Sequence, residues 1–464
     1  MIKNLLNISS GLLGFILVLV FLNDRISHRQ AVVISLFVWM LIWWTNQAVH
    51  YAVTALLPLI ILPIFDIVPL KEASAQYSNP VIYLFFGGFL LALSVEKWGV
   101  HKRLALWLLT LFNRNLSSVF LAVMLATYFL SMWMSNTATA IMMIPIGTAL
   151  LSILVNSASI EPPLHERMYL SIAFSANIGG IATLVGTPPN LVFSGFYTEK
   201  FQTPVTFFEW FTVGFPLSLI FLIIVYLLMK PKESMAFSPE VRKLIKEEYE
   251  RLPAMNSAQR RVLIIFGTVV ALWFAAPFLK LTYINDTSVA LSGGLVLFLV
   301  GTGWRDRQKL LEWNDTRELS WGILLLFGAG LTMASMFDKT GISDEMSRFF
   351  SQSFHSDLVL VVFLVAFTIF ATECMSNVAL TGLMMPVAAS LAQGDQRVFF
   401  FTGMAVAMAS SCAFMLPIAT PPNAVVFGTG QIRMNEMIKK GFILNIVSIL
   451  LFSLVLGYAL KQNP

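Results

Sequence analysis

The sequence predicts an all-α polytopic membrane protein with about 11 transmembrane helices and two re-entrant hairpins, arranged as two inverted repeats. First, the 464-residue chain is 57% hydrophobic and only 12% charged, whereas soluble domains carry about 25% charged residues. Second, apolar runs of about 20 residues, long enough to span a bilayer, recur throughout. Third, short polar motifs occur in the same order in both halves.

The apolar runs predict the individual spans. The first follows Lys3 and lacks a convincing signal cleavage site, so we expect a retained helix rather than a secretory signal. The intervals 117–152 and 357–391 are also apolar but carry polar motifs near their centres. Spans are expected at 8–22, 31–46, 51–68, 82–100, 167–197, 208–229, 262–279, 288–303, 321–336, 397–428 and 441–460.

The basic residues predict the orientation. With a cytoplasmic N-terminus and this span pattern, 21 of the 30 Lys and Arg residues face the cytoplasm, as the positive-inside rule requires. We therefore expect an integral membrane protein with the N-terminus inside and the C-terminus outside. Its compact loops favour the bacterial inner (plasma) membrane. Topology explains the net charge of +5, so a nucleic-acid partner is not needed.

Two helical hairpins are predicted around the polar tripeptides. Ser135-Asn136-Thr137 lies near the middle of 117–152, and Ser376-Asn377-Val378 lies within 357–391. Each arm of about 15 residues would be roughly 23 Å long as a helix, which is short for a full crossing. We expect re-entrant hairpins with the tripeptides at their tips. A pair of helices joined by a polar turn at the membrane surface remains an alternative.

Two broken helices are predicted where Pro-Pro pairs interrupt spans. Gly186-Thr187-Pro188-Pro189-Asn190 falls in 167–197, and Ala419-Thr420-Pro421-Pro422-Asn423 falls in 397–428. Proline breaks the interior of a helix but suits its first turn. We expect new half-helices to begin at the prolines, capped by Thr187 and Thr420, with Gly179-Gly180 loosening the first copy. A simple proline kink is the alternative.

The two halves repeat with nearly constant spacing. Asn136 and Asn377 are 241 residues apart, and Thr187 and Thr420 are 233 apart. Five predicted spans lie between the hairpins, and this odd number makes the second hairpin enter from the opposite face. Inverted repeats with discontinuous helices are typical of secondary transporters that bind their substrate near the bilayer midplane.

The motifs also predict the kind of ligand. Half-helix N-termini favour an anion, whereas hydroxyl and carbonyl oxygens without a His or Cys cluster favour a hard cation such as Na⁺. The segments 117–152, 170–195 and 400–428 contain no charged side chain, so a buried dianion needs co-bound cations to offset its charge. Glu373, the acid in these motifs, is either functional or a packing and capping residue.

At these motifs the chain resembles the divalent anion–sodium symporter family, which includes Na⁺-coupled dicarboxylate and citrate carriers. The resemblance rests on Ser-Asn-Thr, Gly-Thr-Pro-Pro-Asn and the run from Ser411 to Asn423, and it extends over about 45–460. It implies an elevator-type homodimer. Its scaffold would comprise 1–116 and 262–356 and its transport domain 117–230 and 357–464, joined by a cytoplasmic interfacial linker over 231–261.

The resemblance further implies the site residues. Na⁺ would be bound near Ser131, Ser135, Asn136 and Gly186, and near Thr372, Met375, Asn377 and Ala419. Substrate carboxylates would meet Asn136, Thr137, Asn377, Val378, Thr420 and Pro421, supported by the motif residues Ser376, Thr187, Pro188, Pro189, Asn190, Pro422 and Asn423.

One residue departs from the usual pattern, because Val378 stands where dicarboxylate carriers of the family usually have a Thr. Succinate or another C4 dicarboxylate remains the expected substrate, with Na⁺ as the coupled ion. A Na⁺-independent anion exchanger and an anion channel are the alternatives. An enzyme is not expected, since the motifs contain no His-Glu-x-x-His, paired intramembrane aspartates or Ser-His pair.

Overall fold

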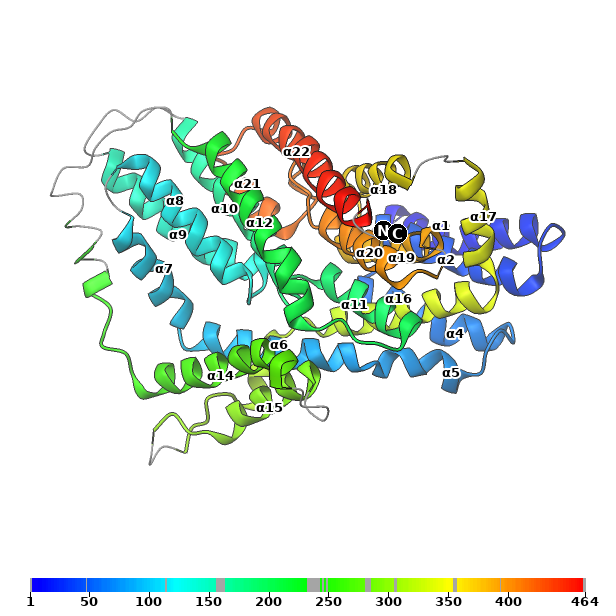
Figure 1. Ribbon diagram of the computed structural model, residues 1–464, viewed down its shortest axis with the longest axis horizontal. Coiled ribbons are helices and arrows are strands. Elements are labelled where there is room, and N and C mark those ends of the chain that lie inside the picture. The colour runs from blue at the N-terminus through cyan, green and yellow to red at the C-terminus, as the bar shows by residue number, and fades with distance from the viewer. Residues whose placement is uncertain are drawn as a thin grey trace.

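A computed structural model describes residues 2–461, apart from 47, 113–114, 156–162, 232–242, 244–245, 248, 280–284, 304–306, 354–356 and 393. The described residues form helices and one isolated bridge, between Gly301 and Lys309, and they contain no strand (Figure 1). The all-helical fold class is confirmed. Most of the predicted linker 231–261 lies outside the described residues or in short fragments.

The first half of the chain contains the first hairpin and the first broken helix. Its helices are α1 (Ile2–Asn23), α2 (His28–Asn46), α3 (Tyr51–Thr54), α4 (Leu57–Ile64), α5 (Leu70–Ala75), the 3-10 helix η1 (Gln76–Ser78), α6 (Pro80–Lys97), α7 (Val100–Leu111), α8 (Leu116–Ser131), α9 (Asn136–Val155), α10 (Pro163–Ala182), α11 (Pro188–Phe201) and α12 (Phe207–Met229).

The second half repeats this plan with a second hairpin and a second broken helix. Its helices are α14 (Ser257–Leu279), α15 (Asp286–Leu299), the 3-10 helix η2 (Trp313–Glu318), α16 (Trp321–Lys339), α17 (Ile342–Ser353), α18 (Asp357–Thr372), α19 (Asn377–Leu391), α20 (Gln396–Ser410), α21 (Pro421–Phe427) and α22 (Met434–Lys461).

The helix lengths agree with a polytopic membrane protein. Within the described residues, six helical stretches are long and apolar enough to cross a membrane, and the hairpin arms are among the shorter apolar helices. One predicted span differs, because 51–68 is divided into α3 and α4. Pro58 lies in the first turn of α4, where its missing N–H costs nothing, so the chain restarts a helix there rather than continuing the previous one.

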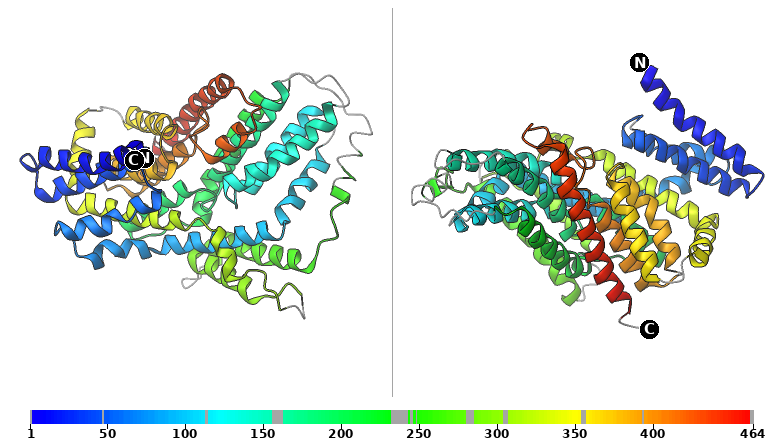
Figure 2. Two further views of the ribbon diagram at one scale, coloured as in Figure 1. Left: turned by 180° about the vertical axis from the view of Figure 1, so that it is seen from behind. Right: turned by 90° about the horizontal axis from the view of Figure 1, so that it is seen from above.

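The two repeats interlock at the centre of the molecule. Helix α21 of the second break packs against α9 and α10 of the first repeat, while α11 of the first break packs against α19 and α20 of the second. Figures 1 and 2 show α11, α19 and α20 between the α8–α9–α10 group on one side and the α1–α2 pair on the other. Each broken helix is thus held by a hairpin arm of the opposite repeat.

A second apolar core lies at the end of the molecule that contains α1 and α2. Its buried side chains come mainly from α2, α4 and α16, and include Trp39, Leu62 and Met333. Ala379, in the first turn of α19, is part of the same cluster. The start of the second hairpin's return arm therefore packs directly against the helices that the sequence assigns to the scaffold.

Candidate functional site

The first hairpin turns at the predicted tripeptide. Helix α8 ends at Ser131 and α9 begins at Asn136, which confirms the hairpin, although its depth in a membrane stays a prediction. The Ser131 hydroxyl oxygen lies 2.6 Å from Asn136 Oδ1 and 2.7 Å from the carbonyl oxygen of Ala176 on α10. The hydroxyl carries a single hydrogen, so this cluster of three oxygens has more acceptors than donors and suits a hard cation.

The second hairpin builds the same cluster from a different hydroxyl. The Thr372 hydroxyl oxygen lies 2.8 Å from Asn377 Oδ1 and 2.7 Å from the carbonyl oxygen of Ser410 on α20. In each repeat, then, the hydroxyl that ends the first arm contacts the asparagine at the tip and a backbone carbonyl of the broken helix. We call these groups the first and second oxygen clusters.

The other predicted cation ligands do not make a described contact with these clusters. Gly186 lies where an added Cβ would be 2.6 Å from the Gly180 carbonyl oxygen and 3.0 Å from that of Met132, so its backbone is close to the tip of the first hairpin. Ser135, Met375 and Ala419 remain predicted ligands. Sequence reasoning missed the Ala176 and Ser410 carbonyls, because backbone oxygens leave no mark in a side-chain pattern.

Both broken helices restart at the prolines, as predicted, and their asparagines hold the broken backbone. Asn190 Nδ2 donates to the carbonyl oxygens of Gly180 and Thr183 at 2.9 and 2.8 Å. Asn423 Nδ2 donates in the same way to the carbonyls ten and seven residues before it, at 3.0 and 3.1 Å. Because a break frees carbonyls that need donors, the asparagine of Pro-Pro-Asn has a structural role.

The expected threonine caps differ between the two repeats. Thr187 and Thr420 both occupy the N-cap position with extended backbone. The Thr420 hydroxyl accepts the Asn423 N–H at 3.3 Å, whereas the Thr187 side chain makes no capping hydrogen bond. The prediction of a side-chain cap is therefore confirmed for Thr420 and wrong for Thr187.

The glycines of the first break permit close packing rather than looseness. A Cβ on Gly179 would lie 2.4 Å from the Tyr128 carbonyl oxygen, and one on Gly180 would lie 2.8 Å from Asn136 Oδ1. These distances are too short for a side chain. The interpretation of Gly179-Gly180 as a flexible element is corrected: the pair lets α10 approach the first hairpin and places Asn136 against it.

Glu373 anchors the second hairpin to the second break. Its carboxylate accepts the backbone N–H groups of Phe414, Met415 and Leu416 at 2.8, 2.9 and 3.0 Å, and the Asn445 amide at 2.8 Å. The residue is 3% exposed, and four donors satisfy its oxygens in place of a basic partner. Of the two interpretations of Glu373, the structure shows the packing and capping role.

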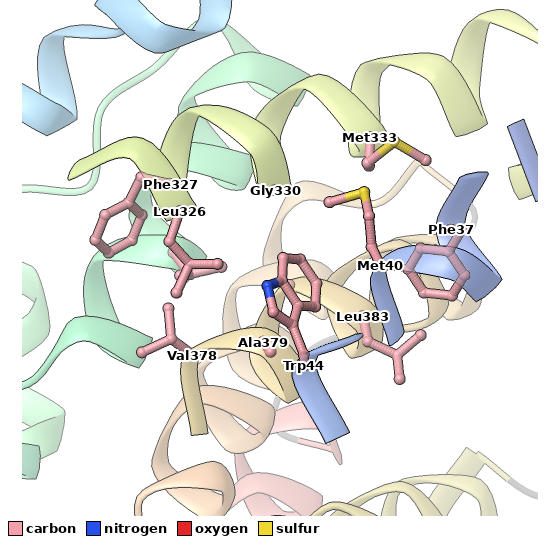
Figure 3. A pocket seen from close by; sticks show the side chains of 12 residues that line it. Phe37, Met40, Trp44, Leu326, Phe327, Gly330, Met333, Val378, Ala379 and Leu383 are labelled. Atoms are coloured by element: carbon pink, nitrogen blue, oxygen red, sulfur yellow. The ribbon is translucent and has the colours of Figure 1, made fainter. Parts of the chain in front are cut away.

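Val378 lies in an apolar wall rather than a polar one. It lines a narrow crevice between α19 and the pair α2 and α16, together with Trp44, Phe327 and Met333 (Figure 3). The crevice also includes Gly330 and Gly382, whose Cα positions lie close to each other. A hydroxyl at position 378 would therefore enter an apolar surface, which gives a packing reason for Val at this place in the repeat.

The arrangement of hairpins and broken helices agrees with a known family. Residues 6–460 match the family described as the sodium:sulfate symporter transmembrane region. The chain belongs to this family. The family membership confirms the resemblance inferred from the Ser-Asn and Thr-Pro-Pro-Asn motifs, and it makes the protein an integral membrane transporter rather than an enzyme.

Curated relatives match over nearly the whole chain. The sodium-dependent dicarboxylate transporter SdcS of Staphylococcus saprophyticus is 33% identical over 98% of this chain and 91% of its own length. SdcS of Staphylococcus aureus is 32% identical over the same shares. Among solved structures, MtrF of Neisseria gonorrhoeae covers 94% of this chain and 96% of its own with a TM-score of 0.56, at 14% identity. That likeness concerns the fold alone.

Proposed function

We propose that this protein is a secondary active transporter that moves a divalent anion together with Na⁺, with a C4 dicarboxylate such as succinate, malate or fumarate as substrate. The observation that carries the proposal is the pair of oxygen clusters at Ser131–Asn136 and Thr372–Asn377. Relatives named sodium-dependent dicarboxylate transporters support the same function. The clusters hold Na⁺, and the anion binds between the two hairpin tips.

Charge balance favours coupled binding of the ions. A dicarboxylate brings two negative charges into segments that contain no Lys or Arg, and burying an unpaired charge costs many kcal/mol. The N-terminus of α9 contributes about half a positive charge at most. Na⁺ in the oxygen clusters supplies the remaining positive charge, so neither ion binds well alone and the two move together.

The hairpin tips and the second broken helix provide the contacts with substrate. We propose that Asn136, Thr137 and Asn377 donate to the carboxylates from the hairpins. Thr420 and Pro421 contact substrate from the second break, and Val378 closes the apolar side. Asn136 and Asn377 then bind both ions: the side-chain oxygen faces Na⁺ and the amide NH₂ group donates to the anion.

We propose an elevator-type movement for the transport cycle. The transport domain comprises 117–230 and 357–464, and the scaffold comprises 1–116 and 262–356, with two chains joined as a homodimer in the bacterial plasma membrane. The apolar crevice between α19 and the pair α2 and α16 supports this division. The residues that line the crevice carry no charged side chain, so the two bodies can slide along this part of their contact without separating a charge pair.

The proposal is tested by uptake of labelled succinate into proteoliposomes. We expect saturable uptake driven by an inward Na⁺ gradient, inhibited by malate. Equal uptake when choline replaces Na⁺ at fixed pH would reject Na⁺ coupling. Counterflow without Na⁺ would identify an exchanger, and a flux that never saturates would identify a channel.

A further inference from the structure

Asn177 connects the two repeats at the centre of the molecule. It lies on α10, five residues before the end of that helix, and is 1% exposed. Its Nδ2 atom lies 3.1 Å from Thr420 Oγ1, and 3.4 Å from both the Ala413 carbonyl oxygen and Asn423 Oδ1. All three acceptors belong to the second break, so a side chain of the first repeat supplies hydrogens to the second.

The contact with Asn177 determines which way the Thr420 hydroxyl points. A threonine hydroxyl has one hydrogen to donate and two lone pairs to accept with. The Thr420 oxygen accepts from the Asn423 backbone N–H at 3.3 Å and from Asn177 Nδ2 at 3.1 Å. Both lone pairs are thereby used, and the hydrogen is left as a donor.

The first two residues of α21 offer no backbone donor to an anion. The two residues after Thr420 are Pro421 and Pro422, and neither has an N–H group. An ionised carboxylate can only accept hydrogen bonds. The hydroxyl of Thr420 is therefore a side-chain donor available to an anion at the start of α21, in place of the two missing N–H groups.

The first repeat lacks this arrangement. Thr187, which corresponds to Thr420 at the spacing of 233, makes no capping hydrogen bond. The residue that corresponds to Asn177 at the same spacing is Ser410, whose hydroxyl contacts Ala407 and Thr381 within the second repeat. The orientation of a threonine hydroxyl by the opposite repeat is thus a feature of one break only.

We propose that Asn177 is a positioning residue for substrate: it occupies a lone pair of the Thr420 hydroxyl, so that the hydroxyl donates its hydrogen to a substrate carboxylate. This inference rests on the proposed function, because it takes Thr420 as a substrate contact. Asn177 does not touch substrate itself. It acts through Thr420, and its removal leaves one lone pair of the hydroxyl without a donor, so that the hydroxyl is free to rotate away from substrate.

The experiment is a double-mutant cycle on the purified full-length protein. Succinate binding at a fixed, saturating Na⁺ concentration is measured by calorimetry for wild type, Asn177→Ala, Thr420→Val and the double variant. We expect Asn177→Ala to weaken binding about threefold to tenfold, the range for loss of one ordinary hydrogen bond, because the Thr420 hydroxyl remains and loses only its orientation. In the Thr420→Val background, Asn177→Ala should have little further effect, since the two residues act as one unit.

Controls separate positioning from folding and from the proposed function. Ser175→Ala, on the same helix, removes a buried hydroxyl that has no hydrogen-bond partner among the described residues, and should bind succinate as wild type does. Asn177→Leu, which fills the volume without donors, replaces Asn177→Ala if that variant does not fold.

The outcomes of the cycle distinguish an error in the role of Asn177 from an error in the proposed transport function. Independent, multiplicative effects of the two substitutions, or unchanged binding by both Asn177 variants, would overturn the role of Asn177 alone. Failure of the wild-type protein to bind succinate, malate, citrate or sulfate in Na⁺ would overturn the proposed function, and the role of Asn177 with it.

Discussion

The hydroxyl of Thr372 donates a hydrogen bond to Asn377 Oδ1 over 2.8 Å, across the tip of the second hairpin. Ser131 and Asn136 repeat this relationship in the first hairpin at 2.6 Å. In each case the bond fixes the asparagine so that its oxygen faces the cluster. A side chain held in place before its ligand arrives loses less entropy on binding, which favours a cation site at each tip.

The first prediction concerns Thr372 as a Na⁺ ligand. Thr372→Val keeps the shape of the side chain but removes one oxygen of the second cluster. We expect the Na⁺ concentration for half-maximal succinate uptake to rise about tenfold to a hundredfold, because one contact with a charged group is worth about 1.5–3 kcal/mol. The control is Thr368→Val, one turn earlier, whose hydroxyl donates to the Leu364 carbonyl of its own helix. If Thr372→Val and Thr368→Val require the same Na⁺ concentration for half-maximal uptake, Thr372 is not a Na⁺ ligand.

The second prediction concerns the anchor at Glu373. Glu373→Gln replaces an acceptor of four hydrogen bonds with a group that places an NH₂ against N–H donors. We expect the free energy of unfolding to fall by about 2 kcal/mol or more, seen as a lower melting temperature of the purified protein. Glu436→Gln, at a partly exposed carboxylate near Lys440, should leave the melting temperature unchanged. A Glu373→Gln protein as stable as wild type would contradict the anchoring role.

The third prediction concerns the departure at Val378. Val378→Thr restores a hydroxyl beside Asn377, on a wall that is otherwise apolar. We expect the ranking of malate, citrate and sulfate as competitors of succinate uptake to change, because the wall gains a hydrogen-bond donor. Val387→Thr, further along the same helix, serves as the control. Identical competition profiles for wild type and Val378→Thr would show that position 378 does not touch substrate.

The fourth prediction uses the two cysteines, which differ in exposure. Cys374, close to the second hairpin tip, is exposed, and Cys412 is buried. A small maleimide should label Cys374, and Cys374→Ser should abolish labelling. Because the residue lies between Thr372 and Asn377, Na⁺ together with succinate should slow the reaction. Two results would contradict the proposed site: labelling that persists in Cys374→Ser, or a labelling rate that is the same with and without Na⁺ and succinate.

The sequence was sufficient for the elements whose cause is local. Pro188 and Pro421 begin helices because a proline fits the first turn of a helix without the loss of a hydrogen bond, and Asn136 and Asn377 begin the return arms at the predicted tripeptides. The family also followed from these motifs, since their order and spacing are specific. These features depend on residues close together in the chain.

Contacts between distant segments could not be read from the sequence. The Ala176 and Ser410 carbonyls complete the oxygen clusters, yet any residue type can provide a carbonyl oxygen. Thr187 makes no capping hydrogen bond, and Asn177 donates to the second break. Both features depend on how the two broken helices pack against each other. The division of 51–68 into α3 and α4 shows the same limit, because an apolar run does not reveal where a buried helix is interrupted.

The most direct measurement for the central claim is an experimental structure of the protein with Na⁺ and succinate bound. We predict Na⁺ at the Ser131–Asn136–Ala176 and Thr372–Asn377–Ser410 clusters, with the dicarboxylate between the amides of Asn136 and Asn377. A structure with succinate bound away from both asparagines, or with both oxygen clusters free of Na⁺ while succinate is bound, would contradict the account.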